Sequence, residues 1–440
     1  MKTNINFNLI KEFLLGLSVI VIITACSTSQ YGIEVLSDDE LIELENRINA
    51  DTGNVSLLKD FALKLLKAHK HDKAEIYFER AILKMPDDPA VLFSKGLNHE
   101  FLEDTLNALQ EYAKYPSVPV TSSYRDIMQG RFILLNRKVV QREIKDLVKD
   151  ENKLDLRTLD TTALAIFPID YLGSDDKYSP LGRGLSEMIS IDLGKVKRLK
   201  ILERIRLNSV TDELAFSQSD LVDPTSAPRV GKLLSAGLIY SGSFNVTDRK
   251  DLDMQLSHWN IVENQRGESI IQRGDISDLF VIEKEVVFRI LNQLEISLTP
   301  LEREEIEFIP TKNLDAFLAY SKGLELEDEG NYDGALNFFR NALELDPKLG
   351  EVSNKIRSSS GVNTSSVNNE QMLEVVDNIE MGVDVLSDDQ FNLINERLET
   401  LGSDIRSGFS QGMDQRQPAQ EAAGVRGFGE LPPPPPPPNL

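Results

Sequence analysis

Histidine and cysteine side chains often act in catalysis or bind metals, and glycine-rich loops often bind phosphate. This chain has few candidates of these kinds. Its four histidines are His69, His71, His99 and His258, and it has one cysteine. His69 and His71 lie two positions apart on a predicted helix, so they do not share a face, and no Cys/His set has zinc-site spacing. Gly182-Arg183-Gly184 lacks the GxxxxGKS spacing of a phosphate-binding loop, so these glycines are expected to serve packing. The sequence predicts no catalytic, cofactor-binding or metal-binding residue, and no enzyme.

Three pairs of adjacent aspartates are the remaining candidates for binding a cation. They are Asp38-Asp39, Asp175-Asp176 and Asp388-Asp389. The first and third pairs stand at predicted helix starts, where acidic side chains interact favourably with the helix dipole. The middle pair stands in a predicted loop and lacks the number of ligands that a calcium site needs, so only weak calcium binding stays open there.

Chemistry of another kind is predicted at Cys26, the one cysteine of the chain. Lys2 and Lys11 precede an uncharged run over residues 13–25 that ends directly before Cys26. A basic start, a short apolar run and a small residue are typical of a secretory signal, which is too short to span a membrane. Ile23-Thr24-Ala25-Cys26 resembles the bacterial lipobox, in which cleavage before the cysteine leaves it carrying lipid, palmitate included. No second cysteine can form a disulfide with it.

We therefore expect a lipoprotein signal peptide over 1–25 and lipidation at Cys26, with an ordinary cleaved signal as the alternative. Ser27 follows the cysteine, and under the bacterial sorting rule it favours the outer membrane, with the body facing the periplasm. No later apolar run approaches the ~18 residues of a membrane helix, so the lipid anchor is the expected membrane attachment. The net charge of −23 opposes binding to nucleic acid, which needs a basic patch.

Two segments, 55–122 and 311–355, show the 34-residue pattern of tetratricopeptide repeats. In this pattern small residues let two helices approach closely and an aromatic ring fills the gap at their crossing. Two units do not bury a continuous face alone, so a connecting helix within 123–155 is expected to close the first stack. The predicted packing residues are Ala62, Ala74, Phe78, Ala81, Pro86, Gly96, Ala108, Tyr112, Gly323, Ala335, Phe339, Ala342 and Pro347.

A short segment near the start of the mature chain recurs near its end. Tyr31–Ala50 and Met381–Thr400 align without gaps and share five consecutive identities, Val35 to Asp39 with Val385 to Asp389. Ser37 and Glu40 form a predicted capping box, followed by apolar residues at helical spacing. We expect an amphipathic helix within the lipidated spacer 26–54 and its duplicate within 381–405. The pattern indicates a duplication or a shared docking surface, and what the two helices dock to stays open.

Residues 160–298 have the pattern of one α/β domain. Leu164–Ile169 is a nearly continuous apolar run, as a strand buried on both faces requires. Further strands are predicted over 199–204, 238–246, 252–262 and 268–274. Helices are predicted after Gly184 and over 208–216, 227–234 and 280–294. Strands joined by helices and then by a meander predict a mixed sheet.

Several motifs of this domain stand in the order and spacing of a known family. They are Ala165-Ile166-Phe167-Pro168, Leu181–Met188, Ile201-Leu202-Glu203-Arg204 and Arg229–Gly242. In these the chain resembles the periplasmic core of the curli-secretion lipoproteins of the CsgG and HfaB type, whose fold relative is the amino-terminal domain of TolB. The resemblance covers about a third of the chain and implies a fold more than an activity.

The resemblance has one clear departure. Curli channels add long membrane hairpins to this core, whereas 170–181 and 238–274 are too short to hold a pair of them. We therefore expect a non-enzymatic scaffold or assembly component of a surface-structure or curli-like secretion system, binding envelope proteins through the repeats and the α/β core. A channel subunit is the alternative, conditional on the strands around Met254, Leu256 and Trp259 extending in an oligomer. A periplasmic ligand-sensing module is a further alternative, and a homo-oligomer stays open.

The remaining segments have the composition of linkers. Residues 356–380 include the Ser/Asn/Gly-rich run 358–366 and are expected to form a flexible linker. The tail 406–440 ends in seven prolines, Pro432–Pro438, which favour an extended polyproline helix in a disordered spacer.

Overall fold

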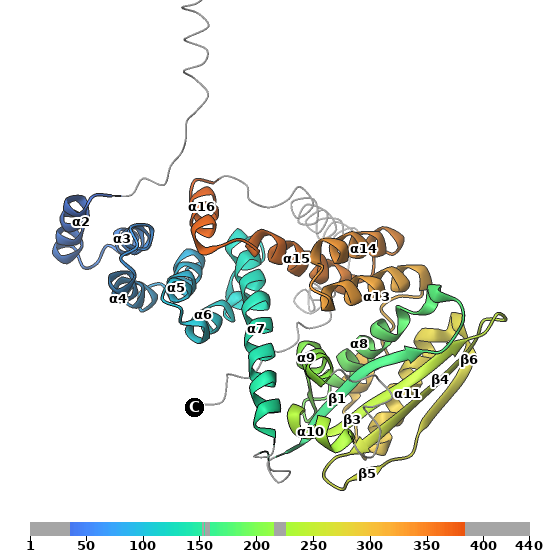
Figure 1. The fold of residues 1–440 in the computed structure, drawn as a ribbon. Coiled ribbons are helices and arrows are strands. Elements are labelled where there is room, and N and C mark those ends of the chain that lie inside the picture. Colours follow the sequence, from blue (N-terminus) through green and yellow to red (C-terminus); the bar gives the residue numbers. More distant parts are fainter. Residues whose placement is uncertain (1–35, 152–153, 155–158, 215–225, 383–440) are drawn as a thin grey trace, which may run out of the picture. The chain divides into compact units, whose positions relative to one another are not determined.

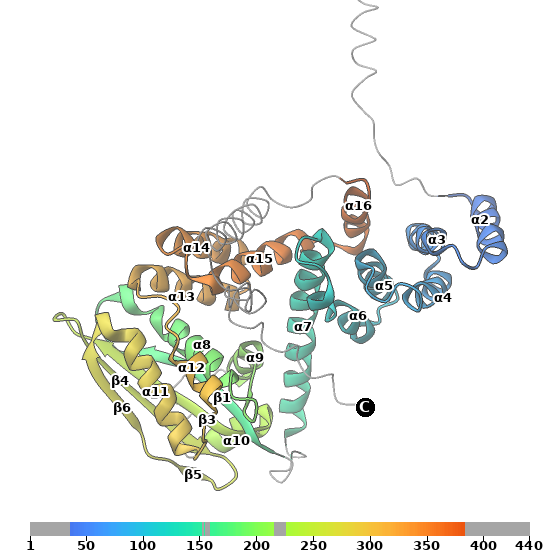
Figure 2. The ribbon, with the colours of Figure 1, turned by 180° about the vertical axis from the view of Figure 1, so that it is seen from behind.

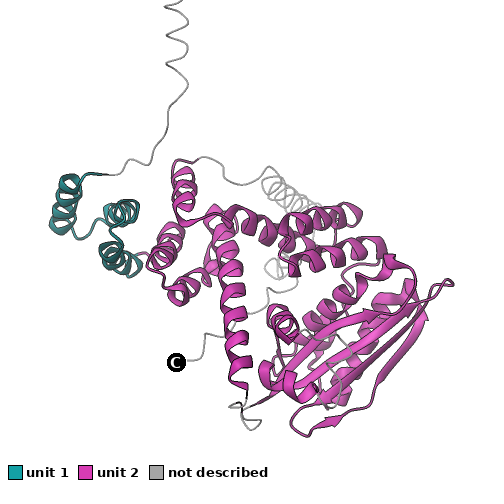
Figure 3. Cartoon of the chain, viewed as in Figure 1, with its two compact units in different colours: residues 1–84 teal, residues 85–440 magenta. Residues whose placement is uncertain are grey.

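The computed structural model describes residues 36–151, 154, 159–214 and 226–382. The chain forms two compact units, Met1–Lys84 and Met85–Leu440, which are described here one at a time (Figure 3). The predicted signal peptide and Cys26, nearly all of the duplicate helix 381–405 and the proline-rich tail 406–440 lie outside the described residues.

Three helices make up the described part of the first unit: α2 (Asp38–Ala50), α3 (Val55–Lys67) and α4 (His71–Ile82). The predicted capping box opens α2, because Ser37 accepts from the amide of Glu40 and the Glu40 carboxylate accepts from the amide of Ser37. Leu41, Leu44 and Ile48 fall on one face of α2 and are buried where it packs on α3. The amphipathic helix predicted within 26–54 is therefore confirmed.

Helices from two distant parts of the chain build one helical layer in the second unit (Figure 1). The early helices are α5 (Pro89–Phe101), α6 (Thr105–Tyr112), the short 3-10 helix η1 (Tyr115–Ser117) and α7 (Ser123–Lys149). The late helices are α13 (Leu314–Asp328), α14 (Tyr332–Leu345), α15 (Gly350–Ser365) and α16 (Asn369–Glu380). The connecting helix α7 packs on α5 and α6 and also on α15, while α16 packs on α5.

The prediction of a flexible linker over 356–380 is wrong, because helices α15 and α16 occupy most of these residues. Ser358, Ser359 and Ser360 are buried in α15, and Gly361 crosses α7 beside Gly130. A Cβ atom on Gly130 would overlap with the carbonyl group of Gly361. Serine and glycine are weak helix formers, which explains the prediction of a linker, but their small side chains let two helix backbones approach closely. Tertiary packing thus outweighs local propensity here.

The α/β domain has the predicted mixed sheet. Its strands are β1 (Asp160–Tyr171), β2 (Lys200–Ile201), β3 (Ala236–Val246), β4 (Asp251–Asn260), β5 (Gln265–Arg266) and β6 (Ile270–Asp275). The strand order is β2-β1-β3-β4-β5, and β6 also pairs with β4. β1 runs parallel to β2 and β3, and the remaining pairs are antiparallel. The second predicted strand, 199–204, shortens to two residues because α9 begins at Arg204.

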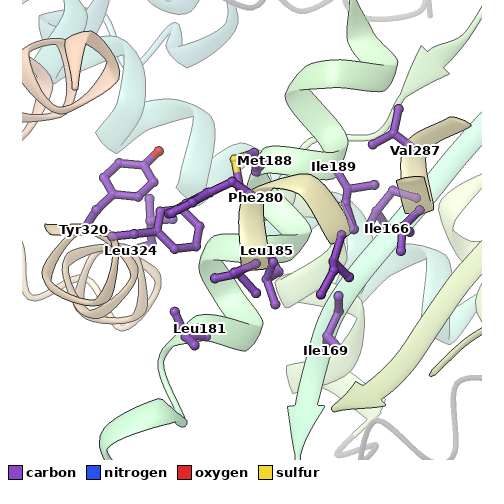
Figure 4. Close-up of a cluster of buried hydrophobic side chains, with 14 of the residues drawn as sticks. Ile166, Ile169, Leu181, Leu185, Met188, Ile189, Phe280, Val287, Tyr320 and Leu324 are labelled. Carbon is purple, nitrogen blue, oxygen red and sulfur yellow. The ribbon is translucent and has the colours of Figure 1, made fainter. Parts of the chain in front are cut away.

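Helices cover the two faces of the sheet to different extents. One face packs on α8 (Leu181–Gly194) and α11 (Leu279–Gln293), which follow the 3-10 helices η4 (Asp176–Tyr178) and η6 (Ile276–Asp278). Figure 4 shows Ile166 and Ile169 of β1 among Leu185, Ile189 and Val287 of these helices. The other face packs on α9 (Arg204–Leu214), α10 (Ala227–Leu234) and the end of α7. Figure 2 shows α11 from behind, near α12 (Pro300–Glu307).

Candidate functional site

The predicted repeat residues pack as expected in both units, with two exceptions. The alanines and aromatic rings are buried, and a Cβ on Gly96 or Gly323 would overlap with the ring of Tyr112 or Phe339, respectively. Pro86 and Pro347 are exposed instead, because each lies beyond the end of its helix. The two prolines therefore follow helix ends and do not pack, which corrects their assignment.

The inner helix of the late repeat is covered by the α/β domain. α13 packs against α8, and a Cβ on Gly184 would overlap with the hydroxyl of Ser321. A Cβ on Gly182 would overlap with the carbonyl oxygen of Ile169. The packing role predicted for these two glycines is confirmed, and the inner face of the late repeat is occupied by the chain itself.

Six charged side chains meet where α8 and α9 contact the helical layer, and we name them the clamp cluster. Its members are Arg183, Glu187, Arg204, Glu327, Asp328 and Lys355. Each of these side chains is at most 18% exposed. The cluster therefore lies mostly out of water, in a region where unpaired charge is costly.

Ion pairs join all the elements around the clamp cluster. Arg183 Nε lies 2.7 Å from Asp328 Oδ2, and Arg204 Nε lies 2.7 Å from Asp328 Oδ1. Arg204 also contacts Glu327 and Glu187, and Lys355 Nζ lies 2.9 Å from Glu327 Oε2. Helices α8, α9, α13 and α15 are thus bound together by charge, in addition to apolar packing.

The electrostatics of the clamp cluster follow from burial and pairing. Burial alone would raise the pKa of Glu327, but Lys355 and Arg204 outweigh it and hold that pKa at about 2. Burial raises the pKa of Asp328 despite its two arginine partners. Burial also raises the pKa of the neighbouring Glu351 to about 7, against the opposing effect of Lys355. Glu327 is therefore the carboxylate that the basic partners of the cluster hold most firmly in its charged form.

A second buried charged group lies between α8 and α11. Asp192 contacts Lys284 and lies 2.7 Å from Lys195, while Glu283 lies 3.4 Å from Lys284. Among the residues that the structure describes, neither carboxyl oxygen of Glu283 finds a hydrogen-bond partner, and the residue is fully buried. Burial and the neighbouring Asp192 charge raise the pKa of Glu283 to about 8. This group sits inside the domain, without the exposure that binding a substrate would need.

The sheet face that packs on α9 and α10 is partly exposed, and we name its exposed part the open sheet face. Residues paired directly across strands share a face, which places Asp170, Ser243, Gln255 and Ile271 in one row and Asn245, Asp253 and Arg273 in the next. Gln255, Ile271 and Arg273 are exposed. The alternate residues of β4, such as Met254 and Leu256, are buried on the opposite face. This surface is polar, with one apolar side chain at its edge, and suits hydrogen bonding to another protein.

The other residues considered for chemistry form no common site, although His69 and His71 contact each other. His69 has a φ of +54° in the turn before α4 and His71 begins that helix, so the prediction that both lie on one helix is corrected. Their rings meet edge to face with centroids 5.6 Å apart. His258 stacks on Tyr240 in the sheet, and Asp175 caps η4. Within the described residues, no group of three or more histidine, cysteine or acidic side chains is placed to hold a metal.

The strands that a channel would have to extend contribute side chains to the core of the domain. Met254 and Leu256 belong to the core beneath α8 and α11, and Trp259 belongs to the core beneath α9 and α10. These side chains therefore pack inside the domain and do not face its surroundings. Among the helices in the described part of the chain, none is both long enough and apolar enough to cross a bilayer.

Comparisons with known structures give weak likenesses, two of which follow. No protein-family model and no curated protein matches this chain. The C-terminal domain of LpoB from Salmonella enterica aligns with 30% of this chain and 95% of its own, at 13% identity and a TM-score of 0.22. A tetratricopeptide repeat protein from Parabacteroides merdae aligns with 72% of this chain and 90% of its own, at 12% identity and a TM-score of 0.21. Scores this low assign no function, so function is argued from the chain's own residues.

Sequence reasoning did not identify the clamp cluster, although one signal was present. Arg183 and Glu187 stand four positions apart on a helix whose other residues are mostly apolar, so both charges lie on one face of it. Charged side chains on a helix that packs against a sheet indicate that each has a partner of opposite charge elsewhere in the chain. Which residues supply that partner depends on the tertiary fold.

Proposed function

We propose that this chain is a non-enzymatic assembly component of the bacterial outer membrane, tethered by lipid at Cys26. Within this proposal it serves a surface-structure or curli-like secretion system, as the sequence resemblance over 160–298 suggests. Its partners are envelope proteins that bind the open sheet face and the exposed sides of the repeat helices.

The observation that carries this proposal is the clamp cluster. Buried ion pairs need every partner in place, so they favour one arrangement of the elements that they join. A ligand-sensing module needs a part that changes its position, whereas the clamp cluster holds the α/β domain against the helical layer. Such a fixed body suits a protein that presents a surface to others.

The test is site-specific photo-crosslinking in a Gram-negative cell that makes the full chain. A photoreactive amino acid replaces Gln255 on the open sheet face or, as the matched control, Glu304, which is exposed on α12. We expect Gln255, and not Glu304, to capture an envelope protein that mass spectrometry identifies.

Two results would contradict the proposal. One is detergent-extracted protein that is strictly monomeric and captures no partner from either position. The other is single-channel conductance of the purified protein in a lipid bilayer, which would favour the channel alternative.

A further inference from the structure

The surface that holds α2 explains how the duplicated segment could be used. We name this surface, which lies on α3 and around the start of α4, the α2 seat. Lys70 Nζ lies 3.1 Å from Asp38, and Glu45 accepts hydrogen bonds from Lys73 (2.5 Å) and from the hydroxyl of Tyr77 (2.8 Å). The apolar part of the contact is made by Leu41, Leu44 and Ile48, which are 4%, 8% and 2% exposed.

The C-terminal segment 387–400 keeps most of the residue types that the α2 seat contacts, with Glu45 as the exception. The three buried positions of α2 correspond to Phe391, Ile394 and Leu398, which are all apolar, and Asp38 corresponds to Asp388. Ser387 and Gln390 keep the residue types of a capping box, in which glutamine can replace glutamate.

Most exposed positions of α2 have changed in the duplicate. Ile42 corresponds to Asn392 and Glu43 to Leu393, while the exposed residues Asp38, Asp39 and Arg47 stay the same, as Asp388, Asp389 and Arg397. The three buried positions thus all stay apolar, whereas Ile42 and Glu43, which face water, change between apolar and polar types. This pattern, together with the five consecutive identities, supports a shared docking surface.

We propose that segment 387–400 docks as a helix on the α2 seat, in exchange with α2. Asp388 would take the place of Asp38 beside Lys70. Asn395 corresponds to Glu45, and its amide oxygen can accept from Tyr77 and Lys73 but carries no charge. The duplicate therefore binds the seat more weakly than α2 does, so α2 occupies the seat until it is weakened or pulled away.

The exchange would change the reach of the lipid anchor. This consequence rests on the proposed lipidation at Cys26, whereas the docking itself does not depend on lipid. With α2 displaced, residues 27–54 form an unfolded tether that can extend to roughly 90 Å. With α2 seated, part of this segment is helical and packed on α3. The C-terminal segment would thereby control how far the body stands from the membrane.

Crosslinking in the full mature chain tests the docking. Changing Cys26 to Ser removes the one native cysteine, so pairs of introduced cysteines can be joined by a short bismaleimide. The test pair is Lys70→Cys with Asp388→Cys. The positive control pairs Lys70→Cys with Asp38→Cys, and the negative control pairs it with Asp404→Cys, beyond the duplicated segment.

Weakening α2 should raise the yield of the test pair several-fold above that of the negative control. Leu44→Asp removes a buried contact of α2, and Ser37→Ala is the milder variant should Leu44→Asp unfold the unit. Leu398→Asp should return the yield to background, whereas Asn392→Asp, at an exposed aligned position, should not.

A crosslinked band at monomer or at dimer mass supports the docking and tells whether the segment comes from the same chain or a second copy. A test pair that crosslinks no better than the negative control, with α2 weakened and the unit folded by circular dichroism, overturns the proposal.

Discussion

Glu283 makes the stability of the α/β domain depend on pH in a way that one substitution should remove. Its carboxyl group is fully buried between α8 and α11, and burial raises its pKa from 4.5 to about 8. The folded state therefore favours the protonated form. This contribution to stability is complete below pH 4.5, declines as the pH rises and is lost above pH 8.

The magnitude follows from the shift. One pKa unit corresponds to about 1.4 kcal/mol, and the slope is incomplete at both ends of the range, so between pH 5 and pH 8 the wild-type protein loses roughly 3.5 kcal/mol of unfolding free energy through this group. Glu283→Gln keeps the shape of the protonated carboxyl and cannot ionise. The variant should match the wild type near pH 5 and be more stable by about that amount at pH 8.

The assay is urea unfolding of both proteins at pH 5, 6.5 and 8, followed by circular dichroism. Glu285→Gln changes an exposed carboxylate on the same helix and serves as the control. The reading of Glu283 as a buried acid fails if the difference between Glu283→Gln and wild type stays constant with pH. It also fails if Glu285→Gln gives the same pH dependence.

Three further predictions test the clamp cluster, the helix crossing and the anchor. Glu327→Gln should lower the unfolding free energy by about 3 kcal/mol at pH 7, measured by urea unfolding. This loss should fade as the pH falls from 4.5 to 2, because the pKa of Glu327 is held at about 2. Gly361→Val should destabilise the helical layer by about 1–3 kcal/mol, measured by thermal unfolding, because a side chain there would overlap with the carbonyl oxygen of Asp126. Cys26→Ser should give a folded protein that leaves the membrane fraction, and its retention in membranes after washing at high salt and high pH would contradict a lipid-only attachment.

The features that the sequence predicted well depend on residues close together in the chain. The run Leu164–Ile169 predicts β1 because a strand buried on both faces has no polar positions. The pairing of Gly323 with Phe339 follows from the fixed repeat of two helices, and the structure places the ring against the glycine. In each case the pattern and its structural partner lie within one repeat or one strand.

The features that the sequence did not predict depend on partners far apart in the chain. Ser358 to Gly361 have the composition of a linker, and only the position of α7 shows that they form a helix packed at close range. Likewise Lys355 is separated from Glu187 in sequence but lies 3.7 Å from it in the clamp cluster. Periodicity marks Glu187 as a charge on a mostly apolar helix, but composition and periodicity do not show which distant residue pairs with it.

The clamp cluster also affects what the rest of the surface can bind. The chain carries a formal charge of −23, yet Arg183, Arg204 and Lys355 are largely enclosed and matched by Glu187, Glu327 and Asp328. Three cations and three anions are thus enclosed together, so the whole net negative charge belongs to residues outside the clamp cluster. An acidic exterior repels anionic lipid headgroups and nucleic acid, so surface charge would hold the body off the bilayer while the lipid proposed at Cys26 would tether it. This combination favours partners with basic or neutral polar surfaces, and the mixed rows of amides, hydroxyls and carboxylates on the open sheet face provide the complementary groups.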